Sequence, residues 1–397
     1  MHNNIYMIAA AWMGLAFVAS VISIRLGISV ALIEILIGVL AGNFLHLKTN
    51  SWIDFLASFG SGLLTFLAGA EIDPASLRRH LKVSLSIGAI AFFVPFIGAL
   101  AFAYFVAGWD RGAAEICGIA LSTTSVAVVY AVMVETGLNR TELGKLILAA
   151  CFVNDFGTVL ALGVLFASFN IWLIVFVVAT AIALYFLPRW TRFIISSMGQ
   201  RVSEPDVKFI LLVLFFLGGL ATSANSEAVL PAYLVGLVIA GVFLQDRLLA
   251  ARIRSIAFTI LTPFYFIKAG LFVSLPAVAS GALLIVALLA VKLVTKFVSV
   301  YPLTRAFHLV KREGLYTTLL MSTGLTFGTI SALFGLTNNI ISQKQYTILV
   351  TVVILSAIVP TLIAQRFFSP AVSAEVTEEE EVRDATEGTR EEPVIVR

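Results

Sequence analysis

Asn154 and Asp155 are adjacent in a stretch of the chain, residues 146–186, that contains no other Asp or Glu and no Lys, Arg or His. A carboxylate is a hard oxygen ligand for a small cation, and it also accepts a proton. It cannot hold both at once, so a cation and a proton compete for the same group. The chemistry available to Asp155 is therefore the exchange of a cation for a proton.

Two runs of hydroxyl side chains could complete such a site. Ser122, Thr123 and Thr124 lie in "ALSTTSVAVVY", and Thr326 lies in "MSTGLTFGTIS". Hydroxyl groups, and carbonyl groups freed where a helix unwinds, are further oxygen ligands, so Asp155 and Thr124 are the expected ligands of a bound monovalent cation. The alternative is that each run is only a packing face for a neighbouring helix, the commoner use of Ser, Thr and Gly in membranes.

Lysine and glutamate side chains provide auxiliary charges. Lys292 and Lys296 are four residues apart and share one face of a helix, although Lys292 has the alternative of snorkelling to the membrane surface. Lys268 lies nearer the end of its helix, which favours snorkelling or a structural role. Glu71, followed by "IDP" at a helix end, and Glu34, one turn inside another helix, are interpreted mainly as structural or interfacial acids.

The composition shows which solvent surrounds these residues. The chain has 397 residues, of which 60% are hydrophobic and 12% charged, and its mean hydropathy is +1.01. A water-soluble domain cannot bury that much apolar surface, so the chain is expected to be a multi-pass protein of the plasma membrane. A removable signal peptide is not expected, because no Lys or Arg precedes Arg25.

Apolar stretches of about 20 residues, each long enough to cross a hydrocarbon layer of roughly 30 Å, recur along the chain. We expect thirteen transmembrane helices, at residues 4–24, 30–47, 53–72, 83–107, 113–134, 142–167, 170–190, 206–224, 227–245, 254–273, 276–304, 315–336 and 344–366. With the N-terminus outside, seventeen Lys and Arg residues fall in inner loops and only Lys48, Arg111 and Lys344 in outer loops. This asymmetry predicts an N-out, C-in topology.

The two hydroxyl runs occupy equivalent places in this plan. One lies in the fifth of helices 1–6 and the other in the fifth of helices 8–13, with helix 7 as a linker. An odd number of helices precedes the second set, so the two sets enter the membrane in opposite directions. The expected fold is all-α, with two inverted six-helix repeats whose helices 5 and 12 are broken and cross near the membrane midplane.

At this point the chain resembles the cation:proton antiporters of the sodium/hydrogen exchanger superfamily, in particular the Nap-like and Kef-like bacterial and archaeal branch. The resemblance covers residues 10–368 and rests on motifs that occur in the family's order: "LIEILIGVLAGN", "FLAGAEIDP", the broken "STTS" helix, "ND", "VLPAYLVGLVIAG" and "LTFGTISALFG". It implies a homodimer in which a core domain moves against a dimerisation domain. It also implies alternating-access exchange of a monovalent cation for a proton, in the service of pH homeostasis.

The resemblance also bears on individual residues. Asp155 is about 20 Å along its helix, deep in the bilayer, where an unpaired charge costs at least ~2.5 kcal/mol and so implies a use. Many relatives have Asp where this chain has Asn154, and the Asn implies electroneutral, one-for-one exchange. Lys296 matches the family's intramembrane lysine. Whether it pairs with Asp155, releases a proton or balances helix dipoles stays open at this stage.

Sodium, with lithium tolerated, is the expected substrate cation. The alternatives are a K⁺/H⁺ antiporter and, with less support, a sodium-coupled organic-anion symporter. No nucleophile set, nucleotide fingerprint or metal-ligand spacing is present, so neither an enzyme nor a cofactor is expected, and nucleic acid is not an expected partner. Residues 1–368 are expected to form the transporter domain, and residues 369–397 a disordered, acidic cytoplasmic tail.

Overall fold

A computed structural model of the chain describes residues 5–26, 30–70, 72, 79, 81–136, 138, 141–166, 171–198, 201–224 and 229–370. Within these ranges the regular structure is entirely helical, as the composition predicts. Glu71 and nearly all of the expected tail, residues 371–397, lie outside the described residues.

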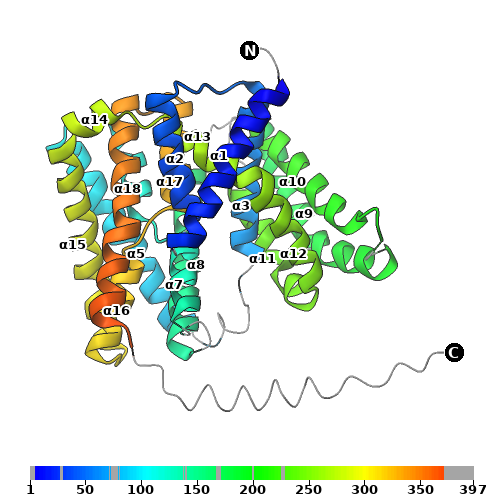
Figure 1. Cartoon of the computed structure of the whole chain (residues 1–397). Coiled ribbons are helices and arrows are strands. Elements are labelled where there is room, and N and C mark those ends of the chain that lie inside the picture. Colours follow the sequence, from blue (N-terminus) through cyan, green and yellow to red (C-terminus); the bar gives the residue numbers. More distant parts are fainter. Residues whose placement is uncertain are drawn as a thin grey trace.

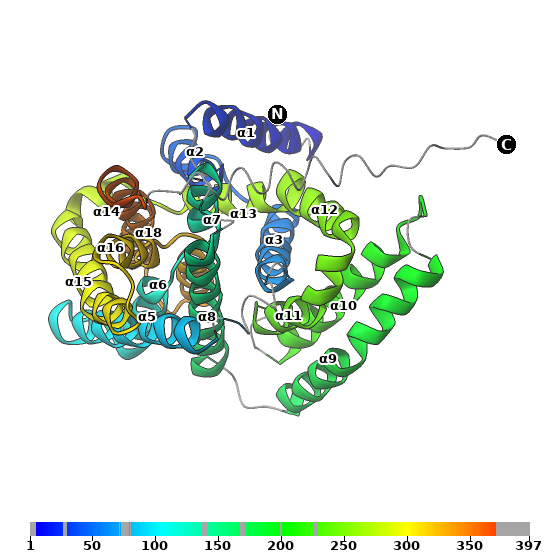
Figure 2. The ribbon, with the colours of Figure 1, turned by 90° about the horizontal axis from the view of Figure 1, so that it is seen from below.

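The helices form two groups, which we name the scaffold bundle and the core bundle (Figures 1 and 2). The scaffold bundle consists of α1 (Ile5–Leu26), α2 (Val30–Phe44), α3 (Ser51–Ala70), α9 (Ile171–Met198), α10 (Pro205–Ser223), α11 (Val229–Gln245), α12 (Arg247–Ile256), the π-helical turn η3 (Ala257–Leu261) and α13 (Thr262–Leu271). The core bundle consists of α5 (Leu81–Ala101), the π-helical turn η1 (Phe102–Val106), α6 (Arg111–Ser122), α7 (Val126–Glu135), α8 (Glu142–Leu165), α15 (Ala282–Ala306), α16 (Lys311–Met321), α17 (Thr326–Thr337), α18 (Gln343–Ile363) and the π-helical turn η4 (Ala364–Phe368). A short helix, α14 (Leu275–Ser280), leads from α13 to α15.

Most of these helices are long and apolar enough to cross a membrane. In the described part of the chain, ten helical stretches meet that description, α16 and α17 being counted together as one stretch. The helices α2 and Leu230–Gln245 are apolar but shorter. The expected fifth span is divided into α6 and α7, with residues 123–125 between them, and the expected twelfth into α16 and α17, with residues 322–325 between them. Both hydroxyl runs therefore interrupt their helices.

Hydrogen-bonding side chains mark where several core helices begin. Asp110 accepts a hydrogen bond from the backbone N–H of Ala113 at the start of α6, and Thr141 accepts one from Gly144 at the start of α8. Such caps satisfy backbone donors that have no partner within the helix. They fix the ends of the helices that carry the hydroxyl run and the Asn-Asp pair.

The scaffold bundle is held by two backbone-to-backbone contacts between glycine-bearing helices. Where α2 meets α13, a Cβ atom added at Gly38 would lie 2.2 Å from the carbonyl oxygen of Ile267. One added at Gly270 would lie 2.1 Å from the carbonyl oxygen of Ile35. No other residue fits at such distances, so small residues bring these two helices into direct contact, a common device in membrane proteins.

The contact between α3 and α11 repeats this arrangement. A Cβ atom at Gly69 would lie 2.3 Å from the carbonyl oxygen of Tyr233, and one at Gly236 would lie 2.1 Å from that of Phe66. Each of the four helices has a carbonyl group that faces the partner helix's glycine, and its own glycine follows three residues later. These carbonyl and glycine residues are Ile35 and Gly38, Ile267 and Gly270, Phe66 and Gly69, and Tyr233 and Gly236. The α2–α13 and α3–α11 pairs thus have the same local geometry.

Candidate cation site

The two interrupted helices meet inside the core bundle, where α6 packs against α17. A Cβ atom at Gly328, in the first turn of α17, would lie 3.0 Å from the carbonyl oxygen of Ala120 in α6. Residues 122–125 and 322–326 are all buried. Four helix ends with unpaired backbone groups are therefore brought together away from water, and other groups must satisfy them.

Asn154 satisfies the first break from α8. Its side-chain Oδ1 accepts a hydrogen bond from the backbone N–H of Thr124 at 2.8 Å, and its Nδ2 donates to the carbonyl oxygen of Ser122 at 3.2 Å. An amide has both a donor and an acceptor, whereas an ionised carboxylate only accepts. Asn154 thus bonds the interrupted backbone in both directions, a role that Asp could not fill in its charged form.

Thr124 connects the first break to two other helices. Its hydroxyl donates to the carbonyl oxygen of Met321, the last residue of α16, at 2.8 Å. It accepts a hydrogen bond from the ammonium of Lys296, on α15, at 3.0 Å. The charge of Lys296 is thereby placed near the carbonyl end of a helix, where the helix dipole favours it. The hydroxyl expected to coordinate sodium is already engaged as donor and acceptor in this structure.

Lys292 reaches the same break one turn earlier on α15. Its ammonium donates to the backbone carbonyl oxygen of Thr123 at 3.2 Å. The side chain is fully buried, so the expectation that it could snorkel to the membrane surface is wrong. Both lysines of the i, i+4 pair point into the site.

Asp155 follows Asn154 on α8, and only 1% of it is exposed. Its Oδ1 atom is buried without a hydrogen-bond partner among the described residues. The ammonium of Lys296 is near enough to interact electrostatically with the carboxylate, but it donates its hydrogen bond to Thr124 instead. A buried carboxylate oxygen without a partner is costly, and a proton or a cation would relieve that cost.

Two residues that the sequence analysis did not single out also border the site. Tyr233, from α11 of the scaffold bundle, donates its hydroxyl to the carbonyl oxygen of Phe152 at 3.0 Å, one turn before Asp155. Ser356, from α18, donates to Val353 and, at 3.5 Å, to the carbonyl oxygen of Gly324 in the second break. Tyr233 lies in the "PAYLVG" motif, which was used only as a family marker.

The other expected residues have separate surroundings. The hydroxyls of Ser122 and Thr123 donate to carbonyl groups one turn back in α6, and Thr326 begins α17 with its side chain buried. Lys268 forms an ion pair with Asp54, at the start of α3, with an N–O distance of 2.8 Å. It therefore joins two scaffold helices and does not reach the cation site.

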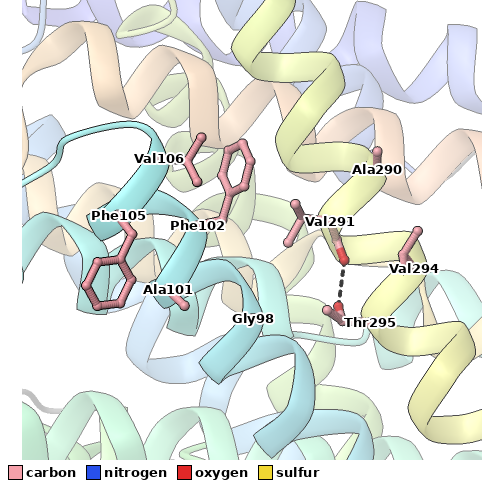
Figure 3. Close-up of a pocket in the computed structure, with 9 residues that line it drawn as sticks. All are labelled: Gly98, Ala101, Phe102, Phe105, Val106, Ala290, Val291, Val294 and Thr295. Atoms are coloured by element: carbon pink, nitrogen blue, oxygen red, sulfur yellow. Dashed lines mark hydrogen bonds between the residues drawn. The ribbon is translucent and has the colours of Figure 1, made fainter.

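A groove of about 550 Å³ lies on another side of α15, between this helix and α5 with η1 (Figure 3). Its lining is almost wholly apolar and includes Phe102, Val291 and Val294. The hydroxyl of Thr295 lies at its edge and donates to the carbonyl oxygen of Val291 at 2.7 Å. With no charged lining residue, this groove offers nothing to a cation.

Two sequence comparisons relate this chain to known proteins. The family profile described as "Sodium/hydrogen exchanger, transmembrane" matches residues 13–369. The "Probable Na(+)/H(+) antiporter 3" of Methanocaldococcus jannaschii is 24% identical over 84% of this chain and 87% of its own length. The "Na(+)/H(+)-K(+) antiporter GerN" of Bacillus cereus is 22% identical over 85% of this chain and 89% of its own.

A solved structure shares the fold. The sodium proton antiporter MjNhaP1 of Methanocaldococcus jannaschii superposes with a TM-score of 0.69, covering 92% of this chain and all of that one at 18% sequence identity. Together with the apolar helices, the family match identifies a multi-pass membrane protein. The chain belongs to the sodium/hydrogen exchanger family.

Proposed function

We propose that this chain is a secondary antiporter of the plasma membrane that exchanges Na⁺, with Li⁺ tolerated, for H⁺ by alternating access. The observation that carries the proposal is Asp155, a buried carboxylate with one oxygen unpartnered where two broken helices cross. The names of the relatives, which are cation/proton antiporters, support it independently.

The exchange follows from what one buried carboxylate can bind. Without a proton, Asp155 attracts a monovalent cation, whose remaining oxygen ligands come from the breaks beside it. With a proton, the side chain is neutral and the cation site has lost its charge. An empty, ionised carboxylate at mid-membrane costs about 2.5–3.5 kcal/mol on insertion scales. The carrier therefore crosses between its two states with either a proton or a cation bound, and this alternation couples the two fluxes.

One-for-one exchange is the stoichiometry that Asn154 favours. Its amide donates to Ser122 and accepts from Thr124, so it is neutral and takes no part in proton binding. Asp155 then carries one positive charge in each direction, and the cycle moves no net charge provided that Lys296 stays protonated.

The proposed topology is thirteen transmembrane helices with the N-terminus outside, arranged as two inverted repeats of helices 1–6 and 8–13. In this numbering α2 and α13 are helices 2 and 10, and α11 and α3 are helices 9 and 3. Exchange of the two repeats turns the first pair of helices into the second pair. The matching glycine contacts of the two pairs therefore support this topology. The core bundle would then move against the scaffold bundle, through which the chain is proposed to form a homodimer.

K⁺/H⁺ exchange is the second candidate, favoured by the relative that is named for both Na⁺ and K⁺. Oxygen ligands serve either ion, and the two would differ only in the size of the cage that the ligands form. A sodium-coupled organic-anion symporter has less support, because the relatives that match this chain are named as cation/proton antiporters.

Purified protein in proteoliposomes tests these alternatives directly. With a proton gradient and a pH-sensitive dye, addition of Na⁺ or Li⁺ should dequench the dye, and K⁺ should do so only at much higher concentration. Asp54→Asn, which removes a carboxylate outside the site, serves as the matched control. Absence of dequenching with all three cations, in protein that is folded and inserted, would exclude cation/proton exchange.

A further inference from the structure

Lys292 is a buried cation whose part in the site is not explained by the exchange chemistry. It is fully buried on α15, and its ammonium donates to the carbonyl oxygen of Thr123 at 3.2 Å. No carboxylate in the described part of the chain forms an ion pair with it. Its neighbour Lys296, by contrast, donates to the hydroxyl of Thr124 and interacts electrostatically with Asp155.

The ammonium occupies a small space between the two breaks. A Cβ atom built on Gly324, in the second break, would lie 2.3 Å from the Nζ atom of Lys292 and 2.9 Å from the hydroxyl oxygen of Thr123. The ammonium thus lies where the first break meets the second, and it fits there because residue 324 has no side chain.

An ammonium ion and an alkali cation make similar demands, since each is a monovalent cation that seeks oxygen ligands. The carbonyl of Thr123 belongs to the unwound segment next to Asn154, and Asn154 precedes Asp155 on α8. Backbone carbonyls freed where a membrane helix unwinds are oxygen ligands for cations in transporters of this architecture, and the Thr123 carbonyl is one of them. In this structure that carbonyl is bonded by Lys292.

We infer that Lys292 is a tethered cation that competes with the transported ion and so sets its apparent affinity. Its ammonium withholds the Thr123 carbonyl from the ion, and its charge repels the ion from the neighbourhood of Asp155. Lys292 is therefore a positioning residue, which acts through the Thr123 carbonyl. The inference rests on the proposed exchange function.

The test measures exchange rate against Na⁺ concentration, at fixed pH, for the native protein and three variants. Lys292→Met removes the charge and keeps the length of the side chain, and should lower the half-saturating Na⁺ concentration. The expected change is at least on the order of tenfold, because a unit charge as far as about 12 Å away already changes affinity tenfold at an effective dielectric constant near 20. The maximal rate should fall, because the ion leaves more slowly.

Two controls accompany it. Lys292→Arg keeps the charge and should retain a half-saturating concentration near the native value. Lys268→Met makes the same substitution at the buried lysine that pairs with Asp54, and should leave the half-saturating concentration unchanged. A purely structural role for Lys292 would instead lower the maximal rate and leave the half-saturating concentration unaltered, and that result would overturn the inference.

Gly324→Ala supplies a second, independent variant should Lys292→Met fail to fold. The added methyl group would displace the flexible ammonium from the Thr123 carbonyl, so the half-saturating Na⁺ concentration should again fall. An increase, or no change, in a folded Gly324→Ala protein contradicts the inference.

A binding measurement separates this inference from the proposed function. If the native protein exchanged none of the three cations, the proposed function would fail. The stabilisation of detergent-solubilised protein by NaCl against heat, compared between native and Lys292→Met, would still report on the competition. Greater stabilisation of Lys292→Met supports it, and equal stabilisation refutes it.

Discussion

At the first break, between α6 and α7, the interrupted backbone is bonded by an amide from α8 and an ammonium from α15. At the second, between α16 and α17, the side-chain bonds come from hydroxyl groups: Thr124 bonds Met321, and Ser356 bonds Gly324. The backbones are interrupted alike, but both lysines and Asp155 gather at the first. The unwound segments are thus similar in the two helices, and the helices packed against them decide where the charged side chains lie.

The strongest way to test this asymmetry is to remove the carboxylate of Asp155. Asp155→Asn keeps the shape of the side chain and abolishes the charge, so we expect cation/proton exchange to fall to background with folding and membrane insertion preserved. Dye dequenching in proteoliposomes measures the loss, with Asp54→Asn as the control. Substantial remaining exchange would mean that another group, such as Glu34 or a lysine, couples the fluxes.

The second test compares the groups that bond the two breaks. Asn154→Ala removes two hydrogen bonds and leaves buried backbone groups unsatisfied, which costs roughly 1–3 kcal/mol for each unsatisfied group. Ser356→Ala removes one long bond at the second break and should cost less than about 1 kcal/mol. Thermal unfolding in detergent should therefore show a clearly larger decrease for Asn154→Ala. Equal decreases would show that the two breaks are stabilised alike.

The third test compares two buried threonines, one from each break. Thr124→Val keeps the side-chain volume but removes the hydroxyl that accepts from Lys296 and donates to the Met321 carbonyl. The exchange rate should therefore fall several-fold. Thr323→Val removes a hydroxyl that donates within α16 and accepts from Ser125 only at 3.5 Å, and should have a smaller effect. A decrease in apparent cation affinity for Thr124→Val would indicate coordination by its side chain. An unchanged affinity would restrict coordination to backbone oxygens.

The smallest expected signal is an electrical one. If Lys296 keeps its proton throughout the cycle, a sodium jump on a solid-supported membrane should produce no sustained current. Lys296→Gln should then be equally silent. A sustained, sodium-dependent current in the native protein that disappears in Lys296→Gln, while exchange persists, would show that the lysine carries a second proton and that transport is electrogenic.

Much of this site could be predicted because its signals are local in the sequence. The two runs of Ser, Thr and Gly occupy equivalent places in the predicted repeats, which favours interrupted helices over packing faces, and both breaks fall at the expected positions. A charge near the middle of an apolar stretch is unusual enough to mark Asp155 and Lys296. These inferences needed no knowledge of which helices touch.

The remaining features depend on helix rotation and on contacts between distant segments. Lys292 is one turn from Lys296, and only the packing of α15 shows that it points inward to Thr123. Periodicity does not reveal that Asn154 bonds a backbone 30 residues away, or that Lys268 pairs with Asp54. Tyr233 and Ser356 reach the site from helices whose apolar sequences give no sign of it.

The hydrogen bond from Tyr233 to Phe152 has a further consequence for the energetics of transport. It links the scaffold bundle to the main chain of the helix that carries Asp155. A rigid displacement of one bundle past the other would have to give up this bond, whose net value is about 0.5–1.5 kcal/mol. The conformation seen here is therefore favoured by that amount over one in which the tyrosine has no partner. An energy difference of this size changes the relative populations of two carrier conformations by roughly two- to thirteenfold, so the tyrosine hydroxyl biases the resting orientation of the carrier without contacting its substrate.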